Sequence, residues 1–172
     1  MSDWGRPVRL ADLARGPVRL TLQPDAAARA QIAKTLELES LPALSAEVVV
    51  SPWLDGASID GRFAATVEQI CGVTLDTFEQ AAAGEISLRV VPAGSPNAPE
   101  EEGGEVALDL EAPDPPDVLE AEEIDVSGYV VEHLALEIDP FPRKPGAAFA
   151  FEPGAANDSP FAVLKGLKRP EG

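Results

Sequence analysis

The chain has 172 residues, of which 45% are hydrophobic and 5% aromatic, enough apolar content for the core of one domain. Its formal net charge of −17, from 13 basic and 30 acidic residues, opposes independent binding to bulk RNA or DNA. The single cysteine, Cys71, excludes an intrachain disulfide and fits a reducing compartment.

The first twenty residues are interrupted by charged side chains and lack the apolar region of a secretory signal. No run of about 18 uncharged apolar residues, the length that spans a bilayer, occurs anywhere in the sequence. We therefore expect a cytoplasmic protein without a membrane-spanning segment.

Short runs of alternating apolar and polar residues predict strands in the first half of the chain. Between the second and third strands, Pro24 and Asp25 favour the start of an alanine-rich helix that continues to about Leu38 and is broken by Leu41-Pro42. The predicted strands are residues 8–10, 18–22, 44–50, 59–71, 73–78 and 86–91.

The later strands follow one another at hairpin-like spacing without helices between them. This order is typical of an antiparallel sheet, here expected to be curved or partly closed as a barrel. With the predicted helices, the fold class is α+β.

Residues 93–116 are rich in Pro, Gly, Glu and Asp, and we expect them to form a disordered insertion. Twelve carboxylates and no Lys or Arg lie between Ala93 and Asp125. The alternation of Val106, Leu108 and Leu110 leaves a short edge strand open. In the simplest interpretation, the acidic run is a solvated linker. In the alternative interpretation, it mimics nucleic acid or binds a basic protein.

A second main helix is predicted directly after the acidic run. Asp125 can cap its N-terminus, and Pro140 and Pro142 end it, because proline lacks the N–H that a helix needs. Apolar residues recur on one face, which must be buried: Val126, Val130, Leu134 and Ile138. A short C-terminal helix is expected at residues 160–167, capped by residues 157–159.

Few residues suggest catalysis or metal binding. Cys71 is either a reactive or metal-bound thiol or, as we favour, a small buried residue at a strand end. His133 is either a general base or pH switch or, again favoured, a partly exposed structural histidine. One Cys and one His do not make a zinc site, and no phosphate loop or serine elbow is visible. We predict no catalytic residues, no metal and no cofactor.

The strand pair of residues 59–75, the stretch IDVSGYVVEHLALEIDPFPRKPGAAF at residues 124–149 and the terminal SPFAVLKGLK resemble the YceD family, also called large ribosomal RNA subunit accumulation proteins, in its alphaproteobacterial form. The most specific features are the helix pattern followed by Pro-x-Pro and the closing Pro-Phe-Ala-Val-Leu. The resemblance implies a non-enzymatic bacterial or plastid factor for accumulation of 23S rRNA.

The chain departs from the wider family at the cysteines. Many members carry Cys-x-x-Cys on the central strand and further cysteines after Pro-x-Pro, whereas here the pair is Cys71 and Thr74 and no cysteine follows Pro142. The additional cysteines of those members suggest a metal site, and because this chain lacks them, metal binding does not transfer to it. The resemblance assigns an interaction surface to these residues: Glu132, Pro140, Pro142, Arg143, Phe161, Ala162, Val163 and Leu164.

We therefore expect one YceD-like domain over residues 1–172, monomeric and without enzymatic activity. Its expected role is in 23S rRNA accumulation and large-subunit biogenesis, through contacts with a ribosomal protein or an assembly factor. We expect direct RNA binding to be secondary. The residues available for phosphate contacts are Arg143, Lys144 and the basic residues near the C-terminus. The alternative is an acidic adaptor or nucleic-acid mimic that binds a basic protein.

Overall fold

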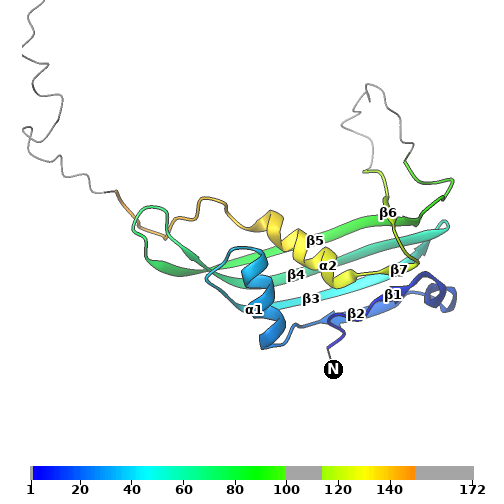
Figure 1. Ribbon diagram of the computed structural model, residues 1–172, viewed down its shortest axis with the longest axis horizontal. Helices are drawn as coiled ribbons and strands as arrows, with labels where there is room; N and C mark the ends of the chain where they lie inside the picture. Colours follow the sequence, from blue (N-terminus) through cyan, green and yellow to red (C-terminus); the bar gives the residue numbers. More distant parts are fainter. Residues whose placement is uncertain (1, 100–113, 150–172) are drawn as a thin grey trace, which may run out of the picture.

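The computed structural model describes residues 2–99 and 114–149 (Figure 1). Its main element is a five-stranded sheet in the order β2-β3-β4-β5-β6, in which only the pair β5 and β6 is parallel. The five strands are β2 (Val18–Leu22), β3 (Ser40–Trp53), β4 (Gly56–Ile70), β5 (Thr77–Pro92) and β6 (Asp117–Leu119). A two-stranded sheet pairs β1 (Val8–Arg9) with β7 (Glu123–Ile124) and so joins the two halves of the chain.

The described residues form three helices, which are η1 (Leu10–Arg15), α1 (Ala26–Thr35) and α2 (Val126–Glu137). Figure 1 shows α1 and α2 on the same side of the five-stranded sheet, with α1 against β3 and α2 against β4 and β5. This arrangement confirms the α+β fold class. No helix in residues 2–99 or 114–149 is long and apolar enough to cross a bilayer.

Helix α2 begins and ends where its sequence predicts. The side chain of Asp125 accepts a hydrogen bond of 3.0 Å from the backbone N–H of Gly128, which caps the N-terminus. The helix ends at Glu137, and Ile138 is already extended, with ψ 125°. Val126, Val130 and Leu134 are buried with at most 1% of their surface exposed, so the predicted apolar stripe faces the sheet.

The inner face of the sheet is shaped to receive α2. Phe63, Ala65 and Val67 alternate along β4 and are all buried, as predicted. Gly84, which pairs with Phe63 across the sheet, has no Cβ, and one placed there would lie 2.9 Å from the Phe63 ring and 3.3 Å from Glu137. A glycine at this position lets the aromatic ring and the end of α2 both approach β5 closely.

The prediction of a partly closed barrel is wrong, because the sheet is open. A barrel requires its first and last strands to pair, whereas β2 and β6 are the two edges here and β6 has only three residues. The helices cover the apolar face of the sheet, so the core is buried without closure.

Two other expectations also need correction. The predicted strand at residues 73–78 is a turn up to Asp76, and Leu75 has a left-handed φ of 61° and is 77% exposed. The strand predicted at residues 44–50 is longer than expected, because β3 runs from Ser40 to Trp53 and includes Pro42 and Pro52. β2 pairs only with the middle of β3, so both prolines lie where β3 has a free edge, the position at which a strand tolerates proline.

Three predicted features lie wholly or largely outside the described residues. They are the edge strand at residues 106–110, the C-terminal helix at residues 160–167 and most of the acidic insertion at residues 93–116.

The buried stripe of α2 provides a test of the packing. Leu134→Ala removes a fully buried side chain and should lower the free energy of unfolding by about 2–5 kcal/mol. Leu136→Ala, on the same helix but 81% exposed, should change it by less than about 0.5 kcal/mol. Urea denaturation of both variants measures the difference, and equal effects would contradict the assigned helix face.

Candidate functional site

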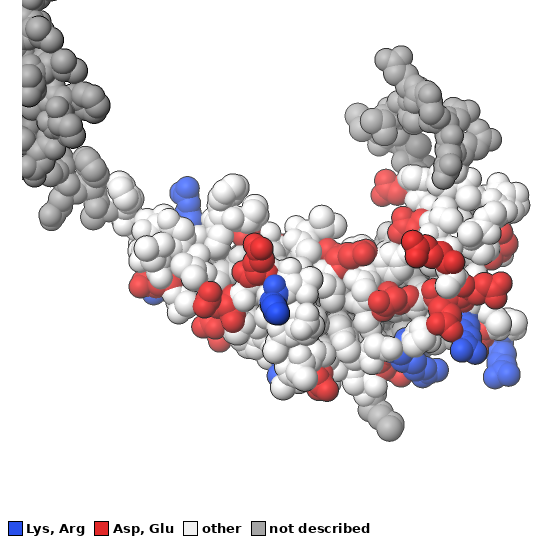
Figure 2. Space-filling model, viewed as in Figure 1, with Lys and Arg blue, Asp and Glu red and all other residues white. Residues whose placement is uncertain are grey.

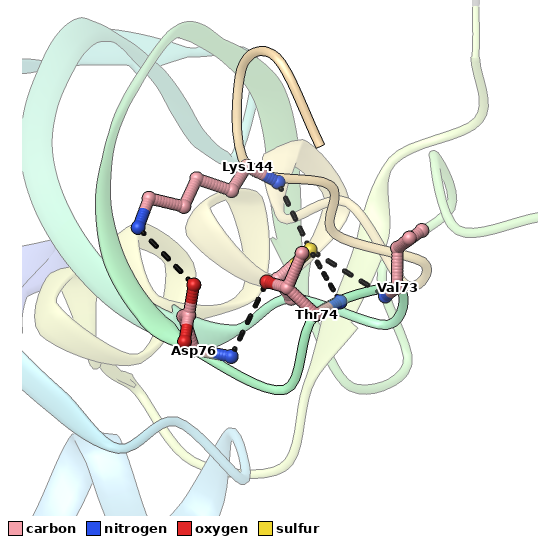
Figure 3. A network of polar contacts seen from close by, with 5 residues as sticks. Val73, Thr74, Asp76 and Lys144 are labelled. Atoms are coloured by element: carbon pink, nitrogen blue, oxygen red, sulfur yellow. Dashed lines mark hydrogen bonds and ion pairs between the residues drawn. The ribbon is translucent and has the colours of Figure 1, made fainter. Parts of the chain in front are cut away.

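Two segments far apart in sequence meet at one end of the molecule. The turn between β4 and β5 lies against the chain that follows α2 (Figure 3). The backbone N–H of Gly72 donates to the carbonyl of Pro142 at 2.9 Å, and the N–H of Lys144 donates to the sulfur of Cys71 at 3.4 Å. We call residues 71–76 and 142–144 together the clasp.

Cys71 is the hydrogen-bonding centre of the clasp. Its buried sulfur accepts backbone N–H bonds from Val73 (3.4 Å) and Thr74 (3.5 Å) as well as from Lys144. Hydrogen bonds from the Thr74 hydroxyl, then from the backbone N–H groups of Thr74 and Lys144, lower the pKa of Cys71 from 9.0 to about 6, against the opposing effect of burial. The expectation that Cys71 is buried is confirmed.

An ion pair ties the two segments together a second time. Lys144 Nζ lies 3.3 Å from Asp76 Oδ2, and the N–H of Asp76 donates to the Thr74 hydroxyl at 3.4 Å (Figure 3). Both charged side chains are about half exposed, so the ion pair adds little stability by itself. The backbone hydrogen bonds from Lys144 to Cys71 and from Gly72 to Pro142 are therefore the main link between the two segments of the clasp.

The clasp end of the molecule exposes large apolar side chains. Phe141 is 80% exposed, Leu75 77% and Ile70 43%, and all three belong to the clasp or adjoin it in sequence. Leu136, in the last turn of α2, is 81% exposed. We call these four residues the apolar rim. Several exposed large side chains at one end of a domain are typical of a surface that binds a partner.

A hollow of about 370 Å³ opens beside the rim, between the end of α1, the end of β4 and the segment after α2. Apolar residues including Ile138, Pro140 and Pro142 form part of its wall. Three carboxylates, those of Glu37, Glu39 and Asp139, and the buried amide of Gln69 supply its polar groups. We call it the acidic hollow.

The structure brings together some of the predicted interaction residues and separates others. Pro140 and Pro142 line the acidic hollow, and Arg143, which is exposed, lies in the clasp. Glu132 lies in the middle of α2, exposed, and its charge helps to raise the pKa of Tyr129 to about 12, after the larger effects of burial and Asp117. Phe161, Ala162, Val163 and Leu164 lie outside the described residues.

His133 is half-buried, and its Nδ1 lies 2.9 Å from the carbonyl oxygen of Tyr129 on the preceding turn. This position fits the structural interpretation that the sequence favoured. No sequence pattern indicated that Gln69, Glu37 and Glu39 line one hollow, because their common position depends on contacts between distant segments.

The donors in the clasp do not fit a metal site. One thiol and one hydroxyl face each other there, and the nearby carboxylate of Asp76 is paired with Lys144. A zinc site needs about four nitrogen, sulfur or carboxylate ligands. Within the described ranges, no three His, Cys, Asp or Glu side chains come close enough to hold an ion.

The model of one protein family, described as large ribosomal RNA subunit accumulation protein YceD, matches residues 59–168. The chain belongs to the YceD family. No curated protein and no solved structure matches it. The matched region of this YceD protein includes the whole clasp, the rim and α2.

The low pKa of Cys71 can be measured without interference, because the YceD chain has one cysteine. Thiolate absorbance should titrate with a midpoint near pH 6 in the folded protein and near pH 9 after unfolding. The thiolate then contributes stability that is complete above pH 9 and is lost as the pH falls to 6.

Thr74→Val should raise the midpoint of the folded protein, because it removes the hydroxyl donor, whereas Thr74→Ser should leave it near 6. A folded-state midpoint near pH 9, or equal midpoints in the two variants, would contradict the hydrogen bonding described for the clasp.

Proposed function

We propose that this YceD-family protein promotes accumulation of large-subunit rRNA without catalysing a reaction, by binding a ribosomal protein or an assembly factor. The family description supplies the link to large-subunit RNA. The observation that carries the mode of action is the apolar rim, whose exposed side chains lie at the end of the molecule that the hydrogen-bonded clasp holds together. A cytoplasmic site of action is expected for such a role.

The charge distribution supports protein rather than RNA as the main partner. Figure 2 shows acidic side chains in patches along the visible face and fewer basic ones, which gather mainly near η1 and β1. RNA binding requires several Lys or Arg side chains that neutralise successive phosphates. In the described chain, the basic residues of the clasp are Arg143 and Lys144, and Lys144 is already paired with Asp76.

The middle of the other face of the sheet carries polar and charged side chains, and hollows of about 280 and 390 Å³ open on it. Across its middle lie Thr21, Glu47, Arg62 and Glu85, one from each of four neighbouring strands, and Arg62 pairs with Glu47 at 2.7 Å. Charges of both signs that pair with each other provide neither an apolar contact for a partner nor an electrostatic potential of a single sign. The clasp end is therefore the better candidate for partner binding.

Complementation of a strain that lacks the gene tests this proposal. The double variant Leu75→Asn/Phe141→Ala removes two exposed apolar side chains of the rim and should fold normally but fail to restore the amount of large-subunit rRNA. Leu54→Asn is a matched control, since Leu54 is also an exposed leucine in a hairpin turn with positive φ, at the opposite end of β4.

The control should restore large-subunit rRNA fully, as measured by its ratio to small-subunit rRNA. Normal large-subunit rRNA in the deletion strain itself would refute the proposed function. Full rescue by the folded double variant would refute the role of the rim.

The run of twelve carboxylates between Ala93 and Asp125 favours a second candidate function, an acidic adaptor or nucleic-acid mimic that binds a basic protein. Replacing residues 100–113 by a Gly-Ser linker of equal length removes six of these carboxylates and keeps the connection between β5 and β6. An assembly role of the folded part predicts normal complementation by this variant, and mimicry predicts its failure.

A further inference from the structure

Gln69, which lines the acidic hollow, carries a buried acceptor without a donor. Gln69 is only 8% exposed, and its Nε2 donates to the backbone carbonyl of Asp139 at 3.1 Å. A carbonyl only accepts, so this bond fixes which end of the amide is the oxygen. Gln69 Oε1 is buried and has no hydrogen-bond partner in the described part of the protein. Because nearly all buried polar groups are paired, this oxygen indicates an absent donor.

The charges around that oxygen show which kind of donor fits. Glu37, Glu39 and Asp139 line the hollow together with Gln69, and no Lys or Arg of the described chain does. Asp139 Oδ1 already accepts a hydrogen bond from the backbone N–H of Phe141 at 2.8 Å. The groups left to receive a ligand are the carboxylates of Glu37 and Glu39, the second oxygen of Asp139 and the amide oxygen of Gln69, all acceptors. A cationic side chain with several N–H groups matches this set.

Glu37 occupies a position that its side chain does not favour. Helix α1 ends in a Schellman motif, in which the N–H of Leu38 donates to Ala33 at 2.9 Å and the N–H of Glu37 to Lys34 at 3.4 Å. Glu37 takes the left-handed place with φ 54°, which glycine usually fills, and its charge lies at the negative end of the helix dipole. Strained residues of this kind are concentrated at binding sites.

We infer that the acidic hollow binds an arginine side chain of a basic segment on the protein partner. The guanidinium has five N–H donors in a planar fork and can donate to Gln69 Oε1 and to a neighbouring carboxylate of the hollow. Its methylene stem packs on the apolar wall at Ile138 and Pro140, and Ile70 beside the hollow contacts an adjacent apolar residue of the segment. That the arginine belongs to a protein partner rests on the proposed function.

Nuclear magnetic resonance titration of the full isotope-labelled chain with acetyl-Leu-Arg-Leu-amide tests this inference. Saturable shifts should appear at the Gln69 side-chain amide and at the backbone amides of Glu37 and Glu39. The analogue with citrulline, which is neutral and nearly the same shape, should not produce them. Shifts elsewhere, or equal shifts with citrulline, would overturn the inference.

Charge variants make the test specific to the hollow. Glu37→Gln and Glu39→Gln should each weaken binding of the arginine peptide roughly 1.5- to 5-fold, the range for an exposed charge pair. Glu79→Gln and Glu85→Gln, on the exposed side of β5, remove the same charge elsewhere and should not change the affinity. Equal effects of the two pairs would show attraction to net charge alone and would overturn the site.

Glu37→Gly has a signature that a purely structural role would not produce. Glycine suits the left-handed position, so this variant should melt at a higher temperature than the parent protein and still bind the arginine peptide more weakly. A rise in melting temperature with unchanged affinity would contradict the role of Glu37.

Complementation of the strain that lacks the gene distinguishes failure of this inference from failure of the proposed function. If Glu37→Gln/Glu39→Gln restores large-subunit rRNA fully while Leu75→Asn/Phe141→Ala does not, the hollow is not the partner site and the proposed function stands. If the strain lacking the gene already has normal large-subunit rRNA, the proposed function fails, and the peptide titration still decides whether the hollow binds arginine.

Discussion

The packing of α2 on the inner face of β4 and β5 determines where every candidate functional group lies. Val130 and Leu134 are completely buried beneath the helix, and Gly84 allows the last turn to approach β5 beside Phe63. The chain therefore leaves α2 directly above the turn between β4 and β5. Two prolines follow, and proline cannot extend a helix. The segment instead bonds to Gly72 and Cys71, which produces the clasp.

The clasp joins two segments about seventy residues apart. The thiol of Cys71 accepts two N–H bonds from its own turn and one from Lys144, and the N–H of Gly72 donates to Pro142, so two backbone bonds cross between the segments. These hydrogen bonds keep the Pro-Phe-Pro segment in place.

Local patterns predicted the elements that depend on local physics. The 3.6-residue period of α2 and its Asp125 cap, and the alternation in β2 and β4, appear in the structure where they were expected. Val73 and Leu75 alternate as in a strand but lie in a turn, because the chain must reverse there to form β5. The clasp, the parallel pairing of β6 and the buried amide of Gln69 depend on contacts between distant segments, which no local pattern encodes.

We propose that this acidic YceD protein acts through protein contacts at its clasp end. Affinity capture of the tagged full chain from its host, before and after nuclease treatment and beside the Leu75→Asn/Phe141→Ala variant, tests this most directly. Large-subunit proteins or assembly factors should stay bound after nuclease treatment and should be lost from the variant. Partners that depart with the RNA, or that the variant retains, would contradict this proposal.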